Sequence, residues 1–542
     1  MHTIQALYAE PLKSFAVRIS LCCAAAILPA SALAQRSSVS INIGVEIETR
    51  GPVHEAFAEP VVFDPDPGLI VPQPPPPLIE EVPPDERPEG EFVSWVPGYW
   101  SWDDDRRSYL WVSGIWRSIP PGRQFVPGYW TQTSGGHQWV SGFWLSVDEQ
   151  DVEYLPQPPA PLSLEPVGAA PAPDYIWVPG CWRWQQGTYV WRPGYWVAPQ
   201  PNWVWVPAHY VRTPSGYVFV SGYWDYVVPR RGLLFAPAYI ERTVITRPGF
   251  VYRPTVVINS QVLVENLFAR PGYRHYYFGD YYAPTYRQAG ILPIHVFHSS
   301  PQGYSALYAH TVAVHRRTDP EWERRFIRTY ELRRDRVDAR PPRTWVSLER
   351  MRRDRVILQD PVRSQTVVLA RPLTELANER SAREIPLRIQ KTSPEQRESV
   401  RQQLTRLREY QAQRRQLELS SADKSPLRIS REQIRPGEGA RAPAAQARPG
   451  ARPTPQAQPR GQDPRDAGRQ VEPSEGLRSL RLRLPRSPLS AQARESDRSK
   501  ATPQRPDAPK ANPSVRPRER SQGPERDNNR KDATPSGARK RS

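Results

Sequence analysis

The chain has almost no cysteine, which excludes two common ways of stabilising a fold. It contains three cysteines. Cys22 and Cys23 lie in an N-terminal segment that we expect to be removed, which leaves only Cys181. One cysteine can form neither an intramolecular disulfide nor a thiolate metal site. Cys181 therefore has either a packing role or a role in an intermolecular disulfide.

Long apolar runs are also missing, except near the N-terminus. Residues 19–28 form a short, mostly apolar run, Lys13 and Arg18 precede it, and Ala32-Leu33-Ala34 has the form of a signal cleavage site. The run is shorter than the roughly 20 residues that a membrane helix needs. This pattern predicts a signal peptide at residues 1–34. It also predicts a mature chain in the periplasm, cell envelope or extracellular space, without a transmembrane segment.

Catalytic motifs are absent as well. The sequence has no His-Glu-x-x-His, no Gly-x-Ser-x-Gly and no phosphate-binding glycine loop. We therefore expect no enzyme activity, no cofactor and no metal. The alternative is a metal-dependent hydrolase in residues 270–315, because a His-x-x-His pair with a carboxylate is able to bind zinc. The histidines of that segment, which lie near Asp280, are His275, His295, His298, His310 and His315.

Proline and basic residues, by contrast, are abundant. There are 64 prolines, and only 38% of the residues are apolar, so much of the length cannot bury a core. Residues 346–542 contain 44 Lys+Arg and 24 Asp+Glu, a net charge of +20, so the first 345 residues carry about −2 of the total +18. We predict a basic, partly helical segment at 346–422 and a disordered basic tail at 423–542.

Tryptophan is concentrated in one part of the chain, since 16 of 18 tryptophans lie between Trp95 and Trp224. A hexapeptide such as Trp-Val-Pro-Gly-Tyr-Trp recurs there eight times, starting at residues 95, 111, 125, 139, 177, 191, 205 and 219. The proline-rich leaders VPQPPPPL at 71–78 and LPQPPAPL at 155–162 each precede four copies. We predict two duplicated modules, 91–146 and 175–230, that are free to move about a linker at 147–174.

Two local geometries fit the hexapeptide. Val96-Pro97-Gly98-Tyr99 has the residues of a type II turn, which would make Trp95 and Trp100 cross-strand neighbours. Alternatively, the strand stays extended with a bulge at Pro-Gly, and these two tryptophans lie on opposite faces. Polar stretches between the copies supply further turns. Both geometries predict short antiparallel strands at a 14-residue period.

The remaining segments complete a mostly β prediction with one or two helices. Residues 35–90 read as a strand followed by an acidic, proline-rich spacer in extended conformation. Residues 231–318 read as a β-rich continuation that caps the repeats. Asp319 and Pro320 predict the start of a helix in 319–345. Ser393-Pro394-Glu395-Gln396 predicts a capping box before a second helix, with an apolar stripe at Val400, Leu404, Leu407 and Tyr410.

The hexapeptides resemble the YXWGXW repeat, also written WXXGXW, of exported bacterial proteins. An aromatic residue, a glycine and a tryptophan keep fixed offsets in seven of the eight copies. One copy has Ala208 and Tyr210 instead of glycine and tryptophan, and Phe125 and Phe219 replace a leading tryptophan in two others. The resemblance covers about 130 of 542 residues. It implies a secreted or envelope repeat module without an established catalytic activity.

The aromatic array has three open interpretations: a packed core, a contact face for a partner or glycan, or self-association through strand edges. For the mature protein we expect a structural or adhesive role in the cell envelope, with carbohydrate or cell-wall polymer binding as the alternative. The basic tail is suited to envelope polyanions rather than to a specific nucleic acid. The candidate contact aromatics are Trp95, Trp100, Trp111, Trp116, Trp130, Trp139, Trp144, Trp177, Trp182, Trp191, Trp196, Trp205 and Trp224.

Overall fold

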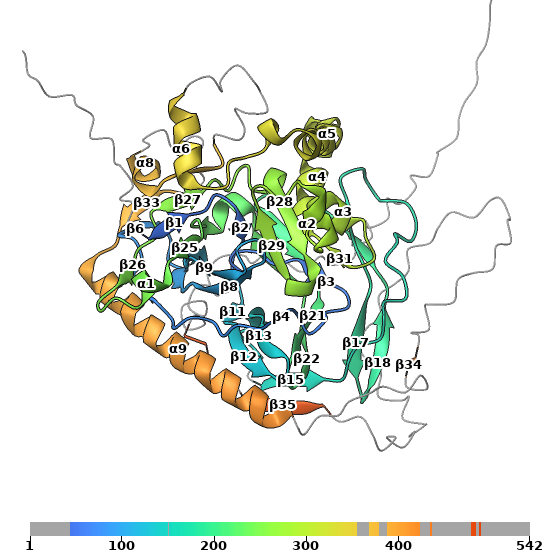
Figure 1. The fold of residues 1–542 in the computed structure, drawn as a ribbon. Helices are drawn as coiled ribbons and strands as arrows, with labels where there is room; N and C mark the ends of the chain where they lie inside the picture. The colour runs from blue at the N-terminus through green and yellow to red at the C-terminus, as the bar shows by residue number, and fades with distance from the viewer. Residues whose placement is uncertain are drawn as a thin grey trace, which may run out of the picture.

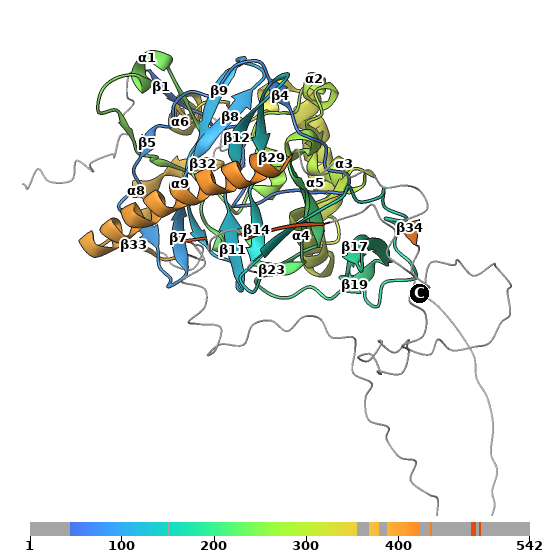
Figure 2. The ribbon, with the colours of Figure 1, turned by 90° about the horizontal axis from the view of Figure 1, so that it is seen from below.

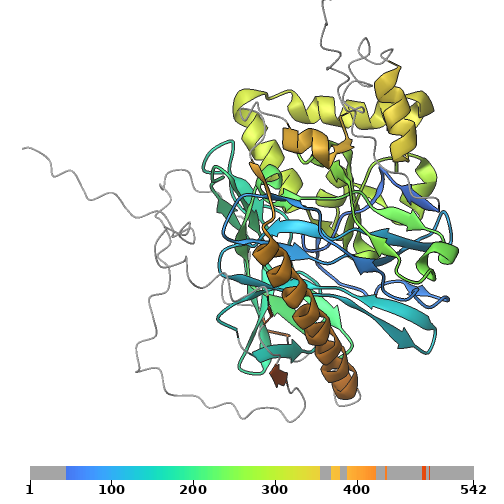
Figure 3. The ribbon, with the colours of Figure 1, turned by 90° about the vertical axis from the view of Figure 1, so that its left-hand side faces the viewer.

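The computed structural model describes residues 44–149, 151–354, 368–378, 387–422, 434–435, 479–483 and 487–488. The predicted signal peptide and most of the predicted tail lie outside this part of the chain. The predicted mostly β class, with antiparallel repeats, is confirmed. Helices α4, α5 and α6 lie along one side of a β-rich body, and the long helix α9 runs along another (Figure 1). Figure 3 shows the same division, with α9 crossing the strands of the repeats.

Each pair of neighbouring hexapeptides forms one two-stranded ribbon. The first hexapeptide lies in the outgoing arm and the second in the returning arm, and both arms are interrupted where Pro-Gly or Ser-Gly occurs. In ribbon 1, Trp95 lies opposite Trp116, and Trp100 lies opposite Trp111. The rings of each pair meet edge to face, with centroids 5.3 and 5.1 Å apart. Ribbon 1 consists of β7 (Val93–Val96), β8 (Tyr99–Asp103), β9 (Ser108–Val112) and β10 (Ile115–Ser118).

Three further ribbons repeat this plan. Ribbon 2 contains β11 (Arg123–Val126), β12 (Tyr129–Thr133), β13 (Gly136–Val140) and β14 (Phe143–Ser146). Ribbon 3 contains β16 (Ile176–Val178), β17 (Cys181–Gln185), β18 (Thr188–Arg192) and β19 (Tyr195–Val197). Ribbon 4 contains β20 (Trp203–Val206), β21 (His209–Thr213), β22 (Gly216–Val220) and β23 (Tyr223–Tyr226).

The break at Pro-Gly is not a turn, so the type II prediction is wrong. The strand direction continues through it, and the cross-strand neighbours come from different hexapeptides. Gly98 has no positive φ, which a type II turn would require at that position. Space explains the glycine instead. A Cβ on Gly128 would lie 2.6 Å from the Val140 carbonyl oxygen, and one on Gly142 would lie 2.7 Å from that of Val126.

The first proline-rich segment is part of the folded body and not the extended spacer that was predicted. Between residues 51 and 90 it contributes five short strands, which pair in order with β29, β31, β13, β26 and β33. Val53, Phe57 and Val61 are at most 1% exposed. We call residues 71–81 leader 1. The N-terminal strands are β1 (Val45–Ile47), β2 (Gly51–Pro52), β3 (Val61–Val62), β4 (Ile70–Val71), β5 (Glu80–Glu81) and β6 (Glu86–Pro88).

The two repeat modules are joined through buried contacts, so the expected free movement about residues 147–174 is not supported. Strand β15 (Asp151–Leu155), in the predicted linker, pairs with β22 of ribbon 4. The Arg117 guanidinium of ribbon 1 donates two hydrogen bonds of 2.7 Å to the Asp225 carboxylate of ribbon 4. Their side chains are 0% and 2% exposed. Because a buried charge that loses its partner is strongly destabilising, this pair fixes the two modules relative to each other.

The segment 231–318 contains helices as well as the predicted strands, and α4 was not predicted. The strands are β24 (Gly232–Leu233), β25 (Ala238–Ile240), β26 (Val251–Tyr252), β27 (Val256–Ile258), β28 (Leu267–Arg270), β29 (His275–Phe278), β30 (Leu292–Pro293) and β31 (Gly303–Tyr304). The helices are α1 (Arg242–Ile245), α2 (Pro284–Gln288), α3 (Ile294–His298) and α4 (Ala306–Thr318). The 3-10 turns are Val264–Asn266 and Pro271–Tyr273, and a further one, Val228–Arg230, directly precedes the segment.

The helix predicted near Asp319 starts slightly later, at α5 (Trp322–Asp335), and buries Trp322 and Phe326. A 3-10 turn (Val337–Ala339), α6 (Trp345–Arg353), β32 (Ala370–Pro372), α8 (Leu373–Asn378) and β33 (Ile389–Lys391) follow. The predicted capping box of α9 (Pro394–Ala422) is confirmed, because the Gln396 N–H donates to Ser393 Oγ and the Ser393 N–H donates to Gln396 Oε1. Figure 2 shows α9 lying across ribbons 1 and 2.

Two short pieces of the predicted disordered tail form strands, which corrects that prediction for these residues. Strand β35 (Leu480–Arg483) pairs with β15, and β34 (Ile434–Arg435) pairs with β18. Arg481 and Arg483 lie 3.5 and 3.3 Å from Glu153 and Asp151. These arginines are exposed, so the ion pairs contribute little stability.

Candidate functional site

Most of the candidate contact tryptophans are inside the molecule. The four that remain half-buried are Trp130, Trp139, Trp177 and Trp196. The nine buried ones are Trp95, Trp100, Trp111, Trp116, Trp144, Trp182, Trp191, Trp205 and Trp224. A side chain with less than a tenth of its surface exposed has little area to offer to a ligand. The array therefore packs the core between ribbons, and only its half-buried members are accessible.

In each ribbon the break leaves main-chain groups without cross-strand partners, and in ribbon 1 a buried carboxylate accepts the free N–H groups. Glu81 Oε2 accepts from the Gly98 N–H at 2.9 Å. Glu81 Oε1 accepts from the Gly114 N–H at 2.9 Å and from the Trp111 Nε1–H at 3.0 Å. Burial raises the pKa of Glu81 to about 7, while these three hydrogen bonds and Arg408 oppose the rise.

Ribbon 2 contains the same arrangement with a different glutamate. Glu55 Oε1 accepts from the Gly128 N–H at 3.1 Å, and Glu55 Oε2 accepts from the Gly142 N–H at 3.0 Å and the Trp139 Nε1–H at 3.1 Å. Burial again raises the pKa of the carboxyl to about 7, against the hydrogen bonds. Each glutamate therefore connects the two arms of one ribbon to the segment N-terminal to the repeats.

The carbonyl groups at the break of ribbon 2 have a basic partner from α9. Arg414 donates to the Pro127 oxygen at 2.7 Å and to the Ser141 oxygen at 3.2 Å. It also pairs with Glu418 at 2.8 Å, and both side chains are 0% exposed. Glu418 accepts a further hydrogen bond of 2.6 Å from the Tyr129 hydroxyl. These contacts explain why the long, arginine-rich helix lies on the ribbons.

A cavity of about 570 Å³ lies between leader 1, ribbons 1 and 2, and α9. Its lining includes both buried glutamates, the half-buried Trp130 and Trp139, and apolar residues of α9 such as Leu407. Large, mostly apolar cavities that contain groups of perturbed pKa are the usual location of ligand sites. Here, however, each carboxylate already accepts three hydrogen bonds from its ribbon, which indicates a structural role for both.

A second cavity, of about 560 Å³, lies beside ribbon 3. Trp177, Pro179 and Trp196 of the ribbon line one side, and residues of α3 and α4, including His298 and Tyr308, line another. The half-buried tryptophans thus line the two large cavities rather than one continuous exposed row. Cys181, at the start of β17, is a free, half-buried thiol whose pKa is raised by burial.

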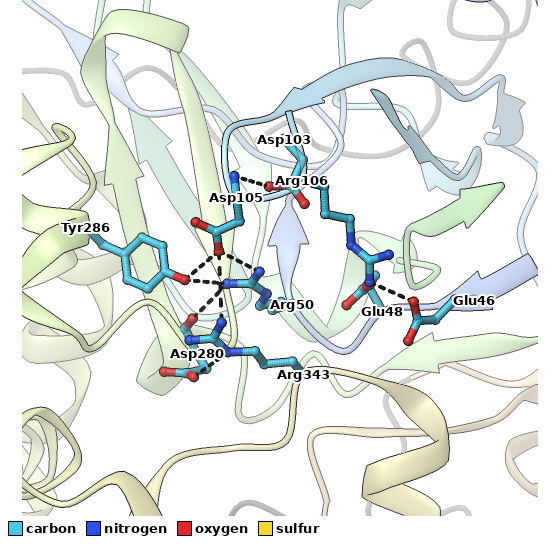
Figure 4. A network of polar contacts seen from close by, with 9 residues as sticks. All are labelled: Glu46, Glu48, Arg50, Asp103, Asp105, Arg106, Asp280, Tyr286 and Arg343. Atoms are coloured by element: carbon cyan, nitrogen blue, oxygen red, sulfur yellow. Dashed lines mark hydrogen bonds and ion pairs between the residues drawn. The ribbon is translucent and has the colours of Figure 1, made fainter. Parts of the chain in front are cut away.

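The turn of ribbon 1 is tied to the cap by a network of charged groups (Figure 4). Arg50 donates to Asp105 at 2.7 Å and to the Tyr286 hydroxyl at 2.8 Å, and that hydroxyl donates to Asp105 at 2.5 Å. Arg343 pairs with Asp280 at 2.8 Å. Acidic and basic groups compensate each other here, so the network anchors the turn.

A second part of the network surrounds Arg106. It pairs with Glu46 at 2.7 Å and also with Glu48. Burial raises the pKa of Glu48 to about 7, which Arg106 opposes. These contacts join the turn of ribbon 1 to β1.

The histidines of 270–315 contact aromatic rings and backbone groups. His275 lies 2.7 Å from the Tyr99 hydroxyl, and His315 stacks on Trp322 with a centroid distance of 4.6 Å. The rings of His295 and His298 meet Tyr330 and Tyr308. Burial lowers the pKa values of His275, His295, His298 and His310 to about 4. Within the described residues, no group of three His, Cys, Asp or Glu side chains is placed to hold a metal ion.

The two glutamates were missed at the sequence level. Their signal was weak: each stands in a short stretch that begins and ends with an apolar residue, Val53-His54-Glu55-Ala56 and Ile79-Glu80-Glu81-Val82, but each stretch also contains a second polar residue. A charge among apolar residues indicates a buried group that needs partners. The acidic, proline-rich composition of the whole segment obscured that local pattern.

Helices that cross membranes are not found in the part of the chain that the structure describes. The chain matches no curated protein and no solved structure. A family model does match. It describes the WXXGXW repeat in two copies and covers residues 95–117, 125–144, 173–197 and 201–224, one block for each ribbon. The ribbon with two hexapeptides is thus the repeating unit, and over residues 95–224 the chain is a WXXGXW repeat protein.

Proposed function

We propose that this chain is an exported, non-enzymatic protein with a structural or adhesive role in the cell envelope. The observation that carries the proposal is the burial of the aromatic ribbons together with their glutamate acceptors. Such a core gives rigidity to a repeat with few aliphatic residues. The buried pair between Arg117 and Asp225 adds to that rigidity by joining the two modules.

Export is supported by the pattern of residues 1–34, and attachment to the envelope by the basic C-terminal part. Residues 346–542 carry a net charge of +20, which favours polyanionic partners through release of counterions. Surface or cell-wall polysaccharide is such a partner, and self-association is the alternative. Binding of cell-wall polymer is the second candidate function, favoured by the half-buried Trp177 and Trp196 at the edge of a cavity.

Fractionation of a bacterial host that expresses the full chain tests the proposed function. We expect a mature protein that begins at Gln35, is recovered outside the cytoplasm, and sediments with isolated cell-wall material. The matched control lacks residues 1–34 and should remain in the cytoplasm. Recovery of the full chain in the cytoplasm with an intact N-terminus would contradict export, and failure to sediment with the cell wall would contradict the adhesive role.

The competing function, a metal-dependent hydrolase in residues 270–315, has its own test. The metal content of the purified mature chain is measured after dialysis. Zinc at one equivalent per chain, together with its loss in a His295→Ala, His298→Ala double variant, would favour the hydrolase and contradict a non-enzymatic role.

A further inference from the structure

Ribbon 3 has the same donors as ribbons 1 and 2 but a different set of partners. By register, Gly180 and Gly194 correspond to the two glycines that bind Glu81, and Trp191 corresponds to Trp111. In the described part of the chain, no acceptor is found for the two glycine N–H groups or for the Nε1–H of Trp191. A Cβ on either glycine would lie 2.7 Å from a carbonyl oxygen of the opposite arm, so the two arms approach closely in ribbon 3 as well.

The second proline-rich segment lies along ribbon 3, as leader 1 lies along ribbon 1. Tyr189 donates to the Pro156 oxygen at 2.5 Å, and Trp182 donates to the Ala160 oxygen at 2.9 Å. Their counterparts in ribbon 1 are the contacts of Tyr109 with Gln73 and of Trp100 with Pro77. In the alignment of VPQPPPPL with LPQPPAPL, Gln73 and Pro77 match residues 157 and 161. The second segment is therefore displaced by one residue along its ribbon.

This displacement moves the second segment's own glutamate away from the donors. Glu165 is the aligned equivalent of Glu81, since both stand ten residues after the first residue of their leader (81 − 71 and 165 − 155). With the shift, Leu164 has the leader position that corresponds to Glu81. Its half-buried side chain lines the 560 Å³ cavity, and its carbonyl accepts from Trp177 Nε1 at 2.8 Å. The Glu165 side chain is exposed.

Ribbon 4 shows what happens where the donor set is not retained. Ala208 replaces one glycine and Phe219 replaces the donor tryptophan. Within the described residues, no carboxylate accepts from the N–H of Ala208 or Gly222, and the nearby Glu59 instead lies 3.6 Å from His209. The full donor set thus occurs in ribbons 1 and 2, where a glutamate uses it, and in ribbon 3, where no described residue does.

The surroundings of the ribbon 3 donors are also more open. Trp177 and Trp196 are half-buried, whereas their counterparts Trp95 and Trp116 are 0% and 1% exposed. The edge of the Trp177 ring abuts Gly194, and the same ring lines the 560 Å³ cavity. The Trp177 ring therefore connects the cavity to one donor residue, Gly194, although none of the three donor residues lines the cavity itself.

We propose that the break of ribbon 3 binds the carboxylate of an acidic sugar, a hexuronic acid unit of a polysaccharide. The carboxylate takes the position that Glu81 has in ribbon 1, and the sugar ring covers Trp177 and Trp196 in the cavity. The source of the polysaccharide rests on the envelope role proposed above, but the binding itself is a property of ribbon 3. An extended acidic peptide fits less well, because the second leader already lies along the ribbon.

Net charge does not explain selectivity at this cavity. Arg316 contributes a positive charge to its lining, and Glu165 and Glu323 contribute negative charges. The amide and indole donors therefore select the carboxylate by hydrogen bonding, as they do for the two buried glutamates.

Calorimetric titration of the full chain with trigalacturonic acid tests this site. About 0.5 M salt screens the basic tail, so that binding to the tail alone is suppressed. We expect binding of the free acid and none of its methyl ester, which has the same rings without the charge. Equal binding of the ester would show that the carboxylate is not recognised, and absence of binding to the acid would overturn the proposal.

Two variants place the binding at ribbon 3. Leu164→Glu puts a carboxylate at the position of Glu81, so it should raise the stability of the protein and weaken binding of the sugar acid about tenfold or more. Ser163→Glu, at an exposed position, is the matched control and should change neither. Trp191→Phe removes one donor, as Phe219 does naturally in ribbon 4, and should weaken binding about fivefold.

Three outcomes would contradict the proposal. Unchanged affinity in both Leu164→Glu and Trp191→Phe, with folding verified by circular dichroism, would place the binding elsewhere. Tighter binding of a hexaglutamate peptide than of the sugar acid would identify an acidic peptide as the ligand class. A loss of stability in Glu165→Gln as large as that in Glu81→Gln would show that Glu165 itself caps the donors. None of these results depends on export, so they are separable from the fractionation experiment.

Discussion

Replacement of Glu81 by alanine tests whether the buried carboxylates hold the ribbons together. The substitution removes the acceptor of three donors. Trp111 and Gly114 are buried and Gly98 is half-buried. A buried donor without a partner costs about 1–3 kcal/mol, so two full losses and one partial loss give about 3–7 kcal/mol. The free energy of unfolding of the full chain should fall by this amount at pH 5. The loss is measured as a lower urea midpoint, followed by tryptophan fluorescence.

The same variant has a predicted pH dependence. Because burial raises the pKa of Glu81 from 4.5 to about 7, the neutral carboxyl favours the folded state. Its contribution is fully present below pH 4.5 and is lost as the pH rises through 7. That difference in pKa corresponds to about 3 kcal/mol. The destabilisation by Glu81→Ala relative to the wild type should therefore be larger at pH 5 than at pH 8 by about 2–3 kcal/mol, because part of the contribution is already lost at pH 5.

The neighbouring Glu80 provides the control, because it is an exposed glutamate on the same strand. Glu80→Ala should change the free energy of unfolding by less than about 0.5 kcal/mol at either pH. If Glu81→Ala were as stable as Glu80→Ala at pH 5, the acceptor role would be refuted. If its destabilisation were equal at pH 5 and pH 8, the assigned pKa would be refuted while the hydrogen bonds would stand.

Three further substitutions test separate contacts. Gly142→Ala would place a Cβ 2.6 Å from a glutamate oxygen and should cost about 1–3 kcal/mol, whereas Gly272→Ala, with nothing within 4 Å, should be neutral in urea unfolding. Asp225→Asn leaves buried guanidinium groups unpaired and should cost about 3–5 kcal/mol, whereas the exposed Asp151→Asn should cost less than about 1 kcal/mol. Arg414→Ala leaves a glutamate buried without its ion pair and should speed hydrogen exchange throughout α9, and unchanged exchange would contradict its anchoring role.

The repeat pattern predicted strands and their antiparallel pairing, but not which copies pair. A period of 14 residues fits either one turn per hexapeptide or one arm per hexapeptide. Only cross-strand packing decides between them. In the structure Trp95 meets Trp116 and Trp100 meets Trp111, so each aromatic pair combines two copies. The interaction is non-local, and the turn residues Pro97 and Gly98 gave a misleading local preference.

Composition was a poor guide to the proline-rich segments. Proline-rich chain has few internal hydrogen bonds and is therefore available for pairing with other elements. Residues 51–90 use that availability, with short strands against the cap and the ribbons. The helices at 322–335 and 394–422 were easier to predict, because caps and apolar stripes are local signals. The burial of most of the tryptophans depended on those proline-rich segments and on α9, so no pattern within the repeats could establish it.

The breaks of ribbons 1 and 2, which each bind a glutamate, explain the residues of the WXXGXW motif in physical terms. Glycine lets the two arms approach closely, and its N–H points at an acceptor because no cross-strand carbonyl is in place. Tryptophan of the opposite arm adds a third donor. The acceptor is a glutamate from outside the repeat, Glu55 for ribbon 2 and Glu81 for ribbon 1. A ribbon is consequently incomplete by itself: it needs a carboxylate from another segment, and ribbon 3 retains that need after its own leader has shifted away.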